Sequence, residues 1–204
     1  MAKAMRIAVP KGGLFSEATK SLEKMGIKLP DEIDKRELII KTKDPSWELL
    51  IVRGHDVPSY VEHGAADLGI VGSDVLIDSR AEVLQLEDLE FGECRLCVCA
   101  KKGIYKNLED LPSYTRVATT FPNITKDYFH KNGLAIEVIH LYGSVELGPL
   151  TGLSDVIVDL VATGKTLEKN GLEVIDEIFP CTARLVANKV SYRLNKEKIN
   201  ALLK

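Results

Sequence analysis

The residues best suited to chemistry form a polar turn directly after a buried-strand pattern. Residues 156–161 are an almost unbroken apolar and β-branched run, typical of a strand buried on both faces, and Asp159 interrupts it. A short helix is predicted over residues 167–170, and Gly171 ends it. Hydroxyls, an ammonium group, backbone N–H groups and the positive end of a helix dipole favour an anion the size of a phosphate. The turn that offers these groups consists of Ala162, Thr163, Gly164, Lys165 and Thr166.

Three interpretations of this turn compete. The Gly164-Lys165-Thr166 triplet matches the end of a Walker A loop, but that loop needs glycine where this chain has Asp159, which excludes it. The turn is similar to the phosphate loop of type I phosphoribosyltransferases, where paired acidic residues precede a Thr-Gly-x-Thr turn. Here a single acid is followed by Leu160 and the spacing is shorter. An ordinary strand-turn-helix connection with Thr163 as N-cap also remains open.

Bulk composition limits the classes of function. A chain of 204 residues can form one domain or two small ones. Its net charge of −3 gives no sign of an extended nucleic-acid surface. No apolar segment is long enough for a signal peptide or a membrane span. We therefore expect a soluble, cytoplasmic protein with no nucleic-acid or membrane partner.

The cysteines raise the question of a metal site. Cys94, Cys97 and Cys99 cluster, whereas Cys181 is far away in the sequence. A strand over residues 91–100 would place Cys97 and Cys99 on one face and Cys94 on the other. Because no second matching pair exists, small apolar filling in a reducing compartment is favoured over metal binding. No metal ion held by the protein itself is expected.

Strands and helices alternate along the chain, which predicts an α/β fold with mostly parallel sheets. Asp56 and Ser144 are the expected N-caps of two helices. Strands are predicted at residues 7–9, 37–41, 48–53, 66–72, 91–100, 116–120, 136–141, 156–161, 173–178 and 181–188. Helices are predicted from residues 16, 56, 73 and 144 onward, and over residues 125–131, 167–170 and 196–203.

Two strand ends in the N-terminal part carry polar or small residues. Lys11 stands at the carboxyl end of the first strand, where ligands of open α/β sheets bind, although a solvated lysine remains the alternative. Gly69 and Gly72, together with Asp67 and Asp74, surround another strand end. Glycines there allow the close approach of a ligand.

Five local patterns spread over the chain belong together. They are Lys11-Gly12 after the first strand, Arg53…Asp56-Val-Pro58, Ala66-Asp67-Leu-Gly-Ile, Gly143-Ser-Val-Glu146 and Asp159-Leu-Val-x-Thr-Gly-x-Thr-Leu. Together they resemble the ATP phosphoribosyltransferase family, in its short form without a C-terminal regulatory domain. The resemblance implies a two-lobed, periplasmic-binding-protein-like (type II) architecture with a central cleft. Lobe I would comprise residues 1–90 and 174–204, and lobe II residues 91–173.

The resemblance implies the first step of histidine biosynthesis. N1 of the adenine of ATP attacks C1′ of phosphoribosyl pyrophosphate, and pyrophosphate leaves with inversion. Mg²⁺, held mainly by substrate phosphates, is the implied cofactor, because it and cationic groups stabilise the charge on the leaving group. The implied catalytic residues, facing the ribose, are Glu146 and Asp159. The turn from Ala162 to Thr166 would hold the 5′-phosphate, and ATP would contact Lys11, Arg53, Asp67 and Leu68.

Structural roles and departures from the family bear on these assignments. Glu146 could instead be a helix-capping acid, and Asp67 could cap the following turn. Gly13 stands where the family usually has Arg, which removes an expected phosphate or nucleotide contact. Phe121 precedes Pro122 where the family commonly has Tyr, which keeps a stacking surface and loses a hydroxyl.

The resemblance also implies partners. Short-form enzymes depend on a regulatory subunit that resembles histidyl-tRNA synthetase, with histidine as feedback inhibitor. A catalytic-chain homodimer within a hetero-octamer is therefore expected. A two-lobed small-solute binding protein and a type I-like phosphoribosyltransferase acting on another base are the alternatives. The phosphate turn and the ribose-type acids together favour phosphoribosyl transfer.

Overall fold

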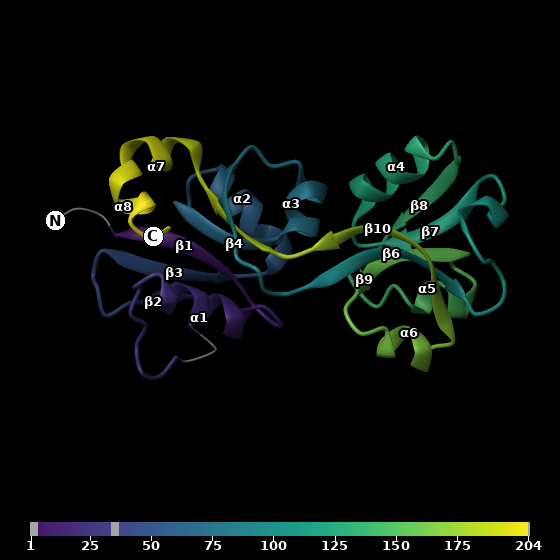
Figure 1. The fold of residues 1–204 in the computed structure, drawn as a ribbon, viewed down its shortest axis with the longest axis horizontal. Coiled ribbons are helices and arrows are strands. Elements are labelled where there is room, and N and C mark those ends of the chain that lie inside the picture. The colour runs from purple at the N-terminus through teal and green to yellow at the C-terminus, as the bar shows by residue number, and fades with distance from the viewer. Residues whose placement is uncertain (1–3, 34–36, 204) are drawn as a thin grey trace. The chain divides into compact units, whose positions relative to one another are not determined.

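The computed structural model describes residues 4–33 and 37–203. The chain divides into two compact units (Figure 1). The first consists of the described residues up to Gly92 and those from Thr182 on, and the second spans Glu93–Cys181. The boundaries expected at 90/91 and 173/174 thus lie at 92/93 and 181/182. The second boundary differs more because residues 174–181 pair along their length with a strand of the second unit.

The first unit is built on a mixed sheet, six-stranded among the described residues, in the order β2-β3-β1-β4-β11-β5. Its central strand β1 is parallel to both β3 and β4. The strands are β1 (Met5–Pro10), β2 (Ile39–Lys41), β3 (Trp47–Val52), β4 (Leu68–Gly72), β5 (Leu84–Asp88) and β11 (Ala183–Ala187). The helices are α1 (Phe15–Lys24), the 3-10 turn η1 (Gly54–Asp56), α2 (Val57–Glu62), α3 (Ser73–Ser79), α7 (Lys189–Leu194) and α8 (Lys196–Asn200).

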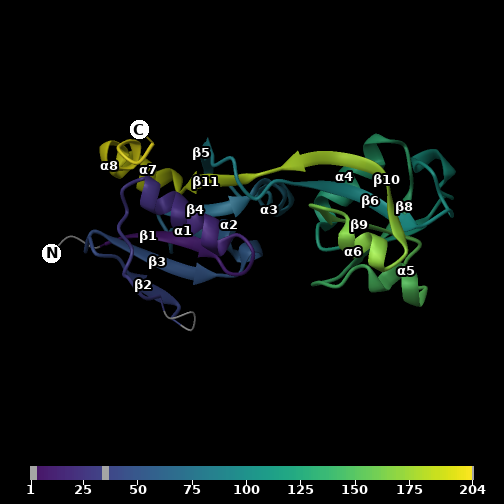
Figure 2. The same cartoon turned by 60° about the horizontal axis from the view of Figure 1, so that its bottom comes forward.

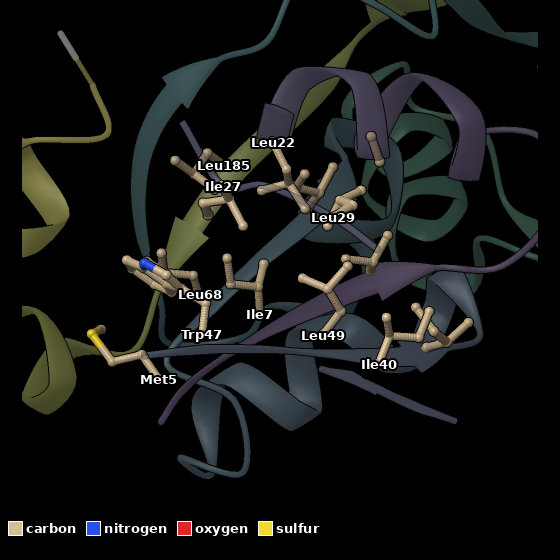
Figure 3. Close-up of a cluster of buried hydrophobic side chains, with 14 of the residues drawn as sticks. Met5, Ile7, Leu22, Ile27, Leu29, Ile40, Trp47, Leu49, Leu68 and Leu185 are labelled. Carbon is tan, nitrogen blue, oxygen red and sulfur yellow. The ribbon is translucent and has the colours of Figure 1, made fainter. Parts of the chain in front are cut away.

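The core of the first unit lies where α1 covers the sheet (Figures 2 and 3). Ala18 and Leu22, four residues apart, form the buried stripe of α1. They meet the apolar side chains of β1 and β3, among them Ile7 and Leu49, which are both fully buried. The strands' apolar runs therefore form the central layer, as their sequence pattern predicts.

Gly69 lets α2 pack directly against β4. A Cβ atom at Gly69 would lie 2.7 Å from Cγ2 of Val61 and 2.8 Å from Cγ1 of Val57. Gly72 likewise leaves room for the carboxylate of Asp74. The protein's own side chains thus make the close approach that these two glycines allow.

The second unit contains a mixed sheet, five-stranded among the described residues, in the order β10-β6-β9-β7-β8. β9 is its middle strand, antiparallel to β6 and parallel to β7, and β7 is parallel to β8. The strands are β6 (Cys94–Lys101), β7 (Thr115–Thr119), β8 (Ile136–His140), β9 (Val156–Val161) and β10 (Leu172–Cys181). The helices are the 3-10 turn η2 (Leu108–Asp110), α4 (Pro122–Lys131), α5 (Leu147–Thr151) and α6 (Lys165–Lys169).

The prediction of mostly parallel sheets was wrong, because among the described strands only four of nine pairings are parallel. One antiparallel pair is the β2–β3 hairpin. The other four involve β5, β6, β10 and β11, the strands next to the two passages of the chain between the units. The prediction also missed β5 and α7.

One further expectation concerns the cysteines of β6, and another concerns membrane-spanning helices. Cys97 and Cys99 lie in the same buried cluster, as strand alternation predicts, and burial raises the pKa of the Cys97 thiol to about 11. In the part of the chain that the structure describes, no helix has the length and apolar character needed to cross a bilayer.

The contact between α2 and β4 predicts that any side chain at residue 69 destabilises the folded protein. Gly69→Ala should lower the free energy of unfolding by about 1–3 kcal/mol, because its methyl group overlaps two buried valines. Urea unfolding measures the difference. Gly13→Ala is the matched control, since a Cβ atom there meets nothing within 4 Å. Equal stabilities of the two variants would contradict the close packing.

Candidate active site

A cavity of about 180 Å³ opens beside the turn that follows β9. It gathers the residues expected to bind phosphoribosyl pyrophosphate, from two separate segments of the second unit. Its lining comprises Glu146, Asp159, Leu160, Val161, Ala162, Thr163, Gly164, Lys165, Thr166 and Leu167. Both predicted catalytic residues and all five predicted phosphate-binding residues are therefore neighbours. We refer to this space as the α6 cavity.

Gly164 shapes the turn into α6. It is the N-cap residue, with φ 74° and ψ −4°, a left-handed conformation that glycine adopts without strain. Thr163 is therefore not the N-cap, and that assignment was wrong. Leu167 is buried in the core and anchors the first turn of α6. The backbone conformation of Gly164 thus fixes the start of α6, and the burial of Leu167 fixes its first turn against the core.

The polar side chains of the turn face solvent. Thr163, Lys165 and Thr166 are exposed. Within the described residues, no hydrogen bond or ion pair occupies their hydroxyl or ammonium groups. The first backbone N–H groups of a helix also lack intrahelical partners. The turn thus offers several uncommitted donors and one positive charge to an anion.

Burial and a neighbouring charge change the titration of Asp159 in the cavity. Desolvation at the end of β9 raises the pKa of Asp159 to about 6, against a hydrogen bond from the Leu160 backbone that lowers it. The negative charge of Glu146 adds to the increase. Such a pair is stabilised by groups that bring hydrogen-bond donors or positive charge.

Glu146 is placed by its neighbours in the chain. The preceding residue, Val145, is buried in the same cluster as Val161 and Leu167. Glu146 itself occupies the position before α5, yet its side chain caps no backbone N–H group. The expectation that Ser144 caps this helix was wrong, as was the helix-capping alternative for Glu146. Its carboxylate is left available to the cavity.

In the first unit the structure brings Lys11 and Arg53 together. They follow the parallel neighbours β1 and β3, and the Lys11 N–H donates to the Val52 carbonyl at 2.7 Å. Both line a cavity of about 410 Å³ that also includes Asp56 and Tyr60. Tyr60 is 41% exposed, whereas its neighbour Val61 is fully buried. Only its packed neighbours decide which side of α2 is covered.

Asp67 and Leu68 lie elsewhere in this unit. Leu68 pairs with Ile7, four residues before Lys11 on β1, which separates them by about 13 Å. The Asp67 carboxylate accepts the Arg6 N–H at 2.8 Å and the hydroxyl of Ser191 at 2.6 Å. Leu68 is fully buried. These two residues hold the sheet and α7 together and do not join the Lys11 cavity.

Comparisons with known proteins agree on one family. A family model described as HisG: ATP phosphoribosyltransferase matches residues 53–204. A protein named ATP phosphoribosyltransferase from Synechococcus elongatus is 45% identical over 202 residues, covering 98% of this chain and 93% of that protein. One of the same name from a Picosynechococcus strain is 48% identical over 198 residues, covering 96% and 94%.

Solved structures show the same relationship. A chain of the ATP phosphoribosyl transferase (HisG:HisZ) complex from Thermotoga maritima matches with a TM-score of 0.84 and 37% identity, covering 98% of this chain and 94% of that one. The periplasmic aliphatic sulphonate binding protein SsuA from Escherichia coli matches in fold alone, with a TM-score of 0.61, 15% identity and coverages of 100% and 71%. Both confirm the predicted two-lobed type II fold.

The raised pKa of Asp159 predicts a pH dependence of stability. The folded protein binds this proton more tightly than the unfolded chain, where the carboxyl titrates near 3.8. The free energy of unfolding should therefore fall as the pH rises from about 4 to about 6. Asp159→Asn removes this loss. The free energy of unfolding of the variant, relative to that of wild type, should therefore increase by up to about 3 kcal/mol as the pH rises from about 4 to about 7. Urea unfolding across this range measures the difference.

Asp155→Asn is the matched control, because the pKa of Asp155 is lowered where that of Asp159 is raised. Asp155, just before β9, accepts a hydrogen bond from Arg116 at 2.8 Å, and this pairing lowers its pKa. That variant should be less stable than wild type at neutral pH, and the deficit should shrink as the pH falls through the folded pKa. A difference between Asp159→Asn and wild type that stays constant with pH would contradict the raised pKa.

Proposed function

The chain belongs to the ATP phosphoribosyltransferase family, and from that premise we propose that the α6 cavity binds phosphoribosyl pyrophosphate. The enzyme is a pentosyltransferase that catalyses the first step of histidine biosynthesis. N1 of the adenine of ATP attacks C1′ of the sugar and pyrophosphate leaves. The observation that carries the proposal is that one cavity gathers an anion-binding turn and two carboxylates.

The 5′-phosphate is assigned to the turn from Ala162 to Thr166. The hydroxyls of Thr163 and Thr166 donate to phosphate oxygens, and Lys165 supplies a charge-assisted contact. Gly164 allows the backbone to approach the ligand without a side chain. The N–H groups at the start of α6 complete the set of donors.

The ribose is assigned to Glu146 and Asp159. Their carboxylates accept hydrogen bonds from the sugar hydroxyls, and these bonds favour the ionised form, which lowers the pKa of Asp159 when substrate binds. Positive charge develops on the ribose ring as pyrophosphate departs, and two nearby carboxylates stabilise it. Inversion needs no covalent intermediate, so the remaining task of the site is to align the nucleophile with C1′.

The phosphates of ATP are assigned to Lys11 and Arg53. Both cations follow parallel strands at the carboxyl edge of the first sheet, which is the binding edge of open α/β sheets. They share their cavity with Asp56 and Tyr60. Gly13 supplies no cation beside them, and Arg6 of β1 is a further cation in the lining of the same cavity.

Mg²⁺ is the proposed cofactor. Among the residues that the structure describes, no three His, Cys, Asp or Glu side chains gather to hold a metal ion. Mg²⁺ is commonly bound through one or two carboxylates together with substrate phosphates and water. Glu146 and Asp159 fit that pattern. When bound, the ion neutralises charge on the departing pyrophosphate.

A regulatory subunit is the proposed partner. The Thermotoga maritima match is part of a HisG:HisZ complex, and this chain aligns with nearly all of its chain. We assign a HisZ-like, histidyl-tRNA-synthetase-like subunit to this protein, with paired catalytic chains in a hetero-octamer. Its substrates and its place in amino-acid biosynthesis favour a cytoplasmic location.

The assignment of the cavity predicts how variants change the kinetics. Thr166→Ala should raise KM for phosphoribosyl pyrophosphate about tenfold or more, because it loses a hydrogen bond to a charged group. Asp159→Asn should lower kcat about tenfold or more, because it removes charge that stabilises the transition state. The assay follows phosphoribosyl-ATP absorbance with Mg²⁺ and pyrophosphatase, with and without the regulatory subunit.

Thr151→Ala is the matched control for the hydroxyl. Thr151 lies on α5 outside the cavity, and its hydroxyl donates to the Leu147 carbonyl at 2.8 Å. Its KM should stay at the wild-type value. Tight binding of phosphoribosyl pyrophosphate without any ATP-dependent product would retain the sugar-phosphate site and reject ATP as the acceptor.

A further inference from the structure

Two cysteines that are distant in the sequence meet at one end of the second sheet. Cys94 is the first residue of β6 and Cys181 is the last residue of β10. The antiparallel register of these strands places the two residues directly opposite each other. Residues paired in this way project their side chains from the same face of a sheet. Both are thiols in the structure. Only the fold brings them together, because nearly the whole second unit lies between them in the chain.

The spacing of paired strands suits a disulfide bond at this position. Directly opposite residues of an antiparallel pair have Cα atoms about 4.5–5.5 Å apart. Disulfides usually join residues whose Cα atoms are about 4.4–6.8 Å apart. The Cβ atoms of opposite residues are about 4.5–5.5 Å apart and have to approach each other by about 1 Å. Cys94 and Cys181 can therefore be joined without separating β6 from β10.

The two other cysteines of β6 cannot replace either partner. Cys97 is three residues beyond Cys94, so strand alternation places it on the opposite face of the sheet, and Cys99 shares that face. Both are fully buried in the cluster beneath α6. Burial raises the pKa of both thiols, that of Cys97 to about 11. Little of the reactive thiolate is therefore present near neutral pH.

The two facing thiols differ in exposure. Cys94 is partly exposed, whereas Cys181 is 2% exposed. The Cys181 thiol donates a weak hydrogen bond to the Phe179 carbonyl, with its Sγ 3.9 Å from the oxygen. An external oxidant can therefore reach Cys94 first, and Cys181 lies where it can displace that oxidant from the strand opposite. Redox-responsive proteins commonly place a resolving cysteine beside an accessible one in this way.

The pair stands at both ends of the second unit. That unit spans Glu93–Cys181, so the two thiols lie beside the points where the chain enters and leaves it. Their strands are neighbours, and β6 also pairs with β9, the strand that carries Asp159. A bond between them would fasten the end of β10 to this sheet and close the chain of the unit that contains the α6 cavity. Closing so long a loop removes conformational freedom from the unfolded chain.

We propose that Cys94 and Cys181 form a reversible disulfide that joins the two ends of the second unit under oxidising conditions. In a reducing compartment such a bond is transient and responds to the redox state. The inference does not depend on the proposed reaction.

Glutathione disulfide is the class of oxidant that the exchange requires. The Cys94 thiolate attacks one of its sulfurs and releases one glutathione thiolate. The Cys181 thiolate then attacks the Cys94 sulfur of the mixed disulfide and releases the second glutathione thiolate. The two protein thiols lose two protons and two electrons, and one glutathione disulfide becomes two glutathione thiols.

Peptide mapping of the full chain tests the pairing. The native protein is oxidised in a glutathione redox buffer, alkylated, and digested with trypsin without reduction. Trypsin cuts after Arg95, which separates Cys94 from the two buried cysteines of β6. The cysteine-containing peptides are residues 81–95, 96–101 and 170–184. Mass spectrometry should find the first joined to the third, with the middle peptide alkylated, and dithiothreitol should release both partners.

The closed loop also predicts a redox-dependent stability. Oxidised wild type should unfold at a urea concentration about 1 M or more above that of reduced wild type. Cys94→Ser cannot form the bond, so its midpoint should be the same in both buffers, and its partly exposed position allows it to fold. Cys97→Ala is the matched control, because it removes a thiol of β6 but retains the facing pair and should therefore retain the shift.

Three results would overturn the proposal. They are an oxidised wild type without the link between peptides 81–95 and 170–184, glutathione retained on Cys94 as a stable mixed disulfide, and a redox shift of the urea midpoint that persists in Cys94→Ser. Formation of phosphoribosyl-ATP by the reduced protein is a separate measurement. Its absence rejects the proposed reaction and leaves the disulfide standing, whereas product without the link rejects the disulfide alone.

Discussion

The partial burial of a carboxylate at the end of a central strand is the constraint on which the candidate site depends. β9 is the middle strand of its sheet, and its apolar side chains pack on both faces. Asp159 is held in this environment, beside the charge of Glu146, and both effects raise its pKa. A carboxylate in that position is stabilised when hydroxyl groups or a cation approach it.

Apolar packing holds the rest of the site around that carboxylate. Val145, Val161 and Leu167 belong to one buried cluster, and each directly adjoins a cavity-lining residue or is one. The polar ends of α5 and α6 are consequently positioned by the same core. Thr163, Lys165 and Thr166 can remain exposed and uncommitted because the turn does not depend on them for its shape. Rigid backbone and available donors are what a phosphate and a ribose require.

The first unit shows how position along a strand decides the role of a charged residue. Lys11 and Arg53 follow the carboxyl ends of parallel strands and share a cavity. Asp67 lies at the opposite end of the neighbouring strand, where Arg6 and Ser191 occupy its oxygens. Removal of Asp67 would therefore act on the fold, whereas removal of Lys11 would act at the edge proposed to bind ATP. The same family motif can contain residues of both kinds.

The sequence by itself determined the features that depend on neighbours along the chain. Most of the α6 cavity is the clearest example, because the turn from Ala162 to Thr166 and Asp159 lie on one continuous segment, whereas Glu146 joins them from another. The buried strand before it and the alternation of Cys97 and Cys99 are equally local. Tertiary structure decided whatever depends on distant segments: the mixed strand directions, the edge to which Asp67 belongs, the burial of Phe121, whose ring therefore offers no stacking surface, and the pairing of the cysteines at the start of β6 and the end of β10. The reason is physical, since local patterns specify a strand or a turn, whereas pairing partners and covering helices are selected by packing across the whole unit.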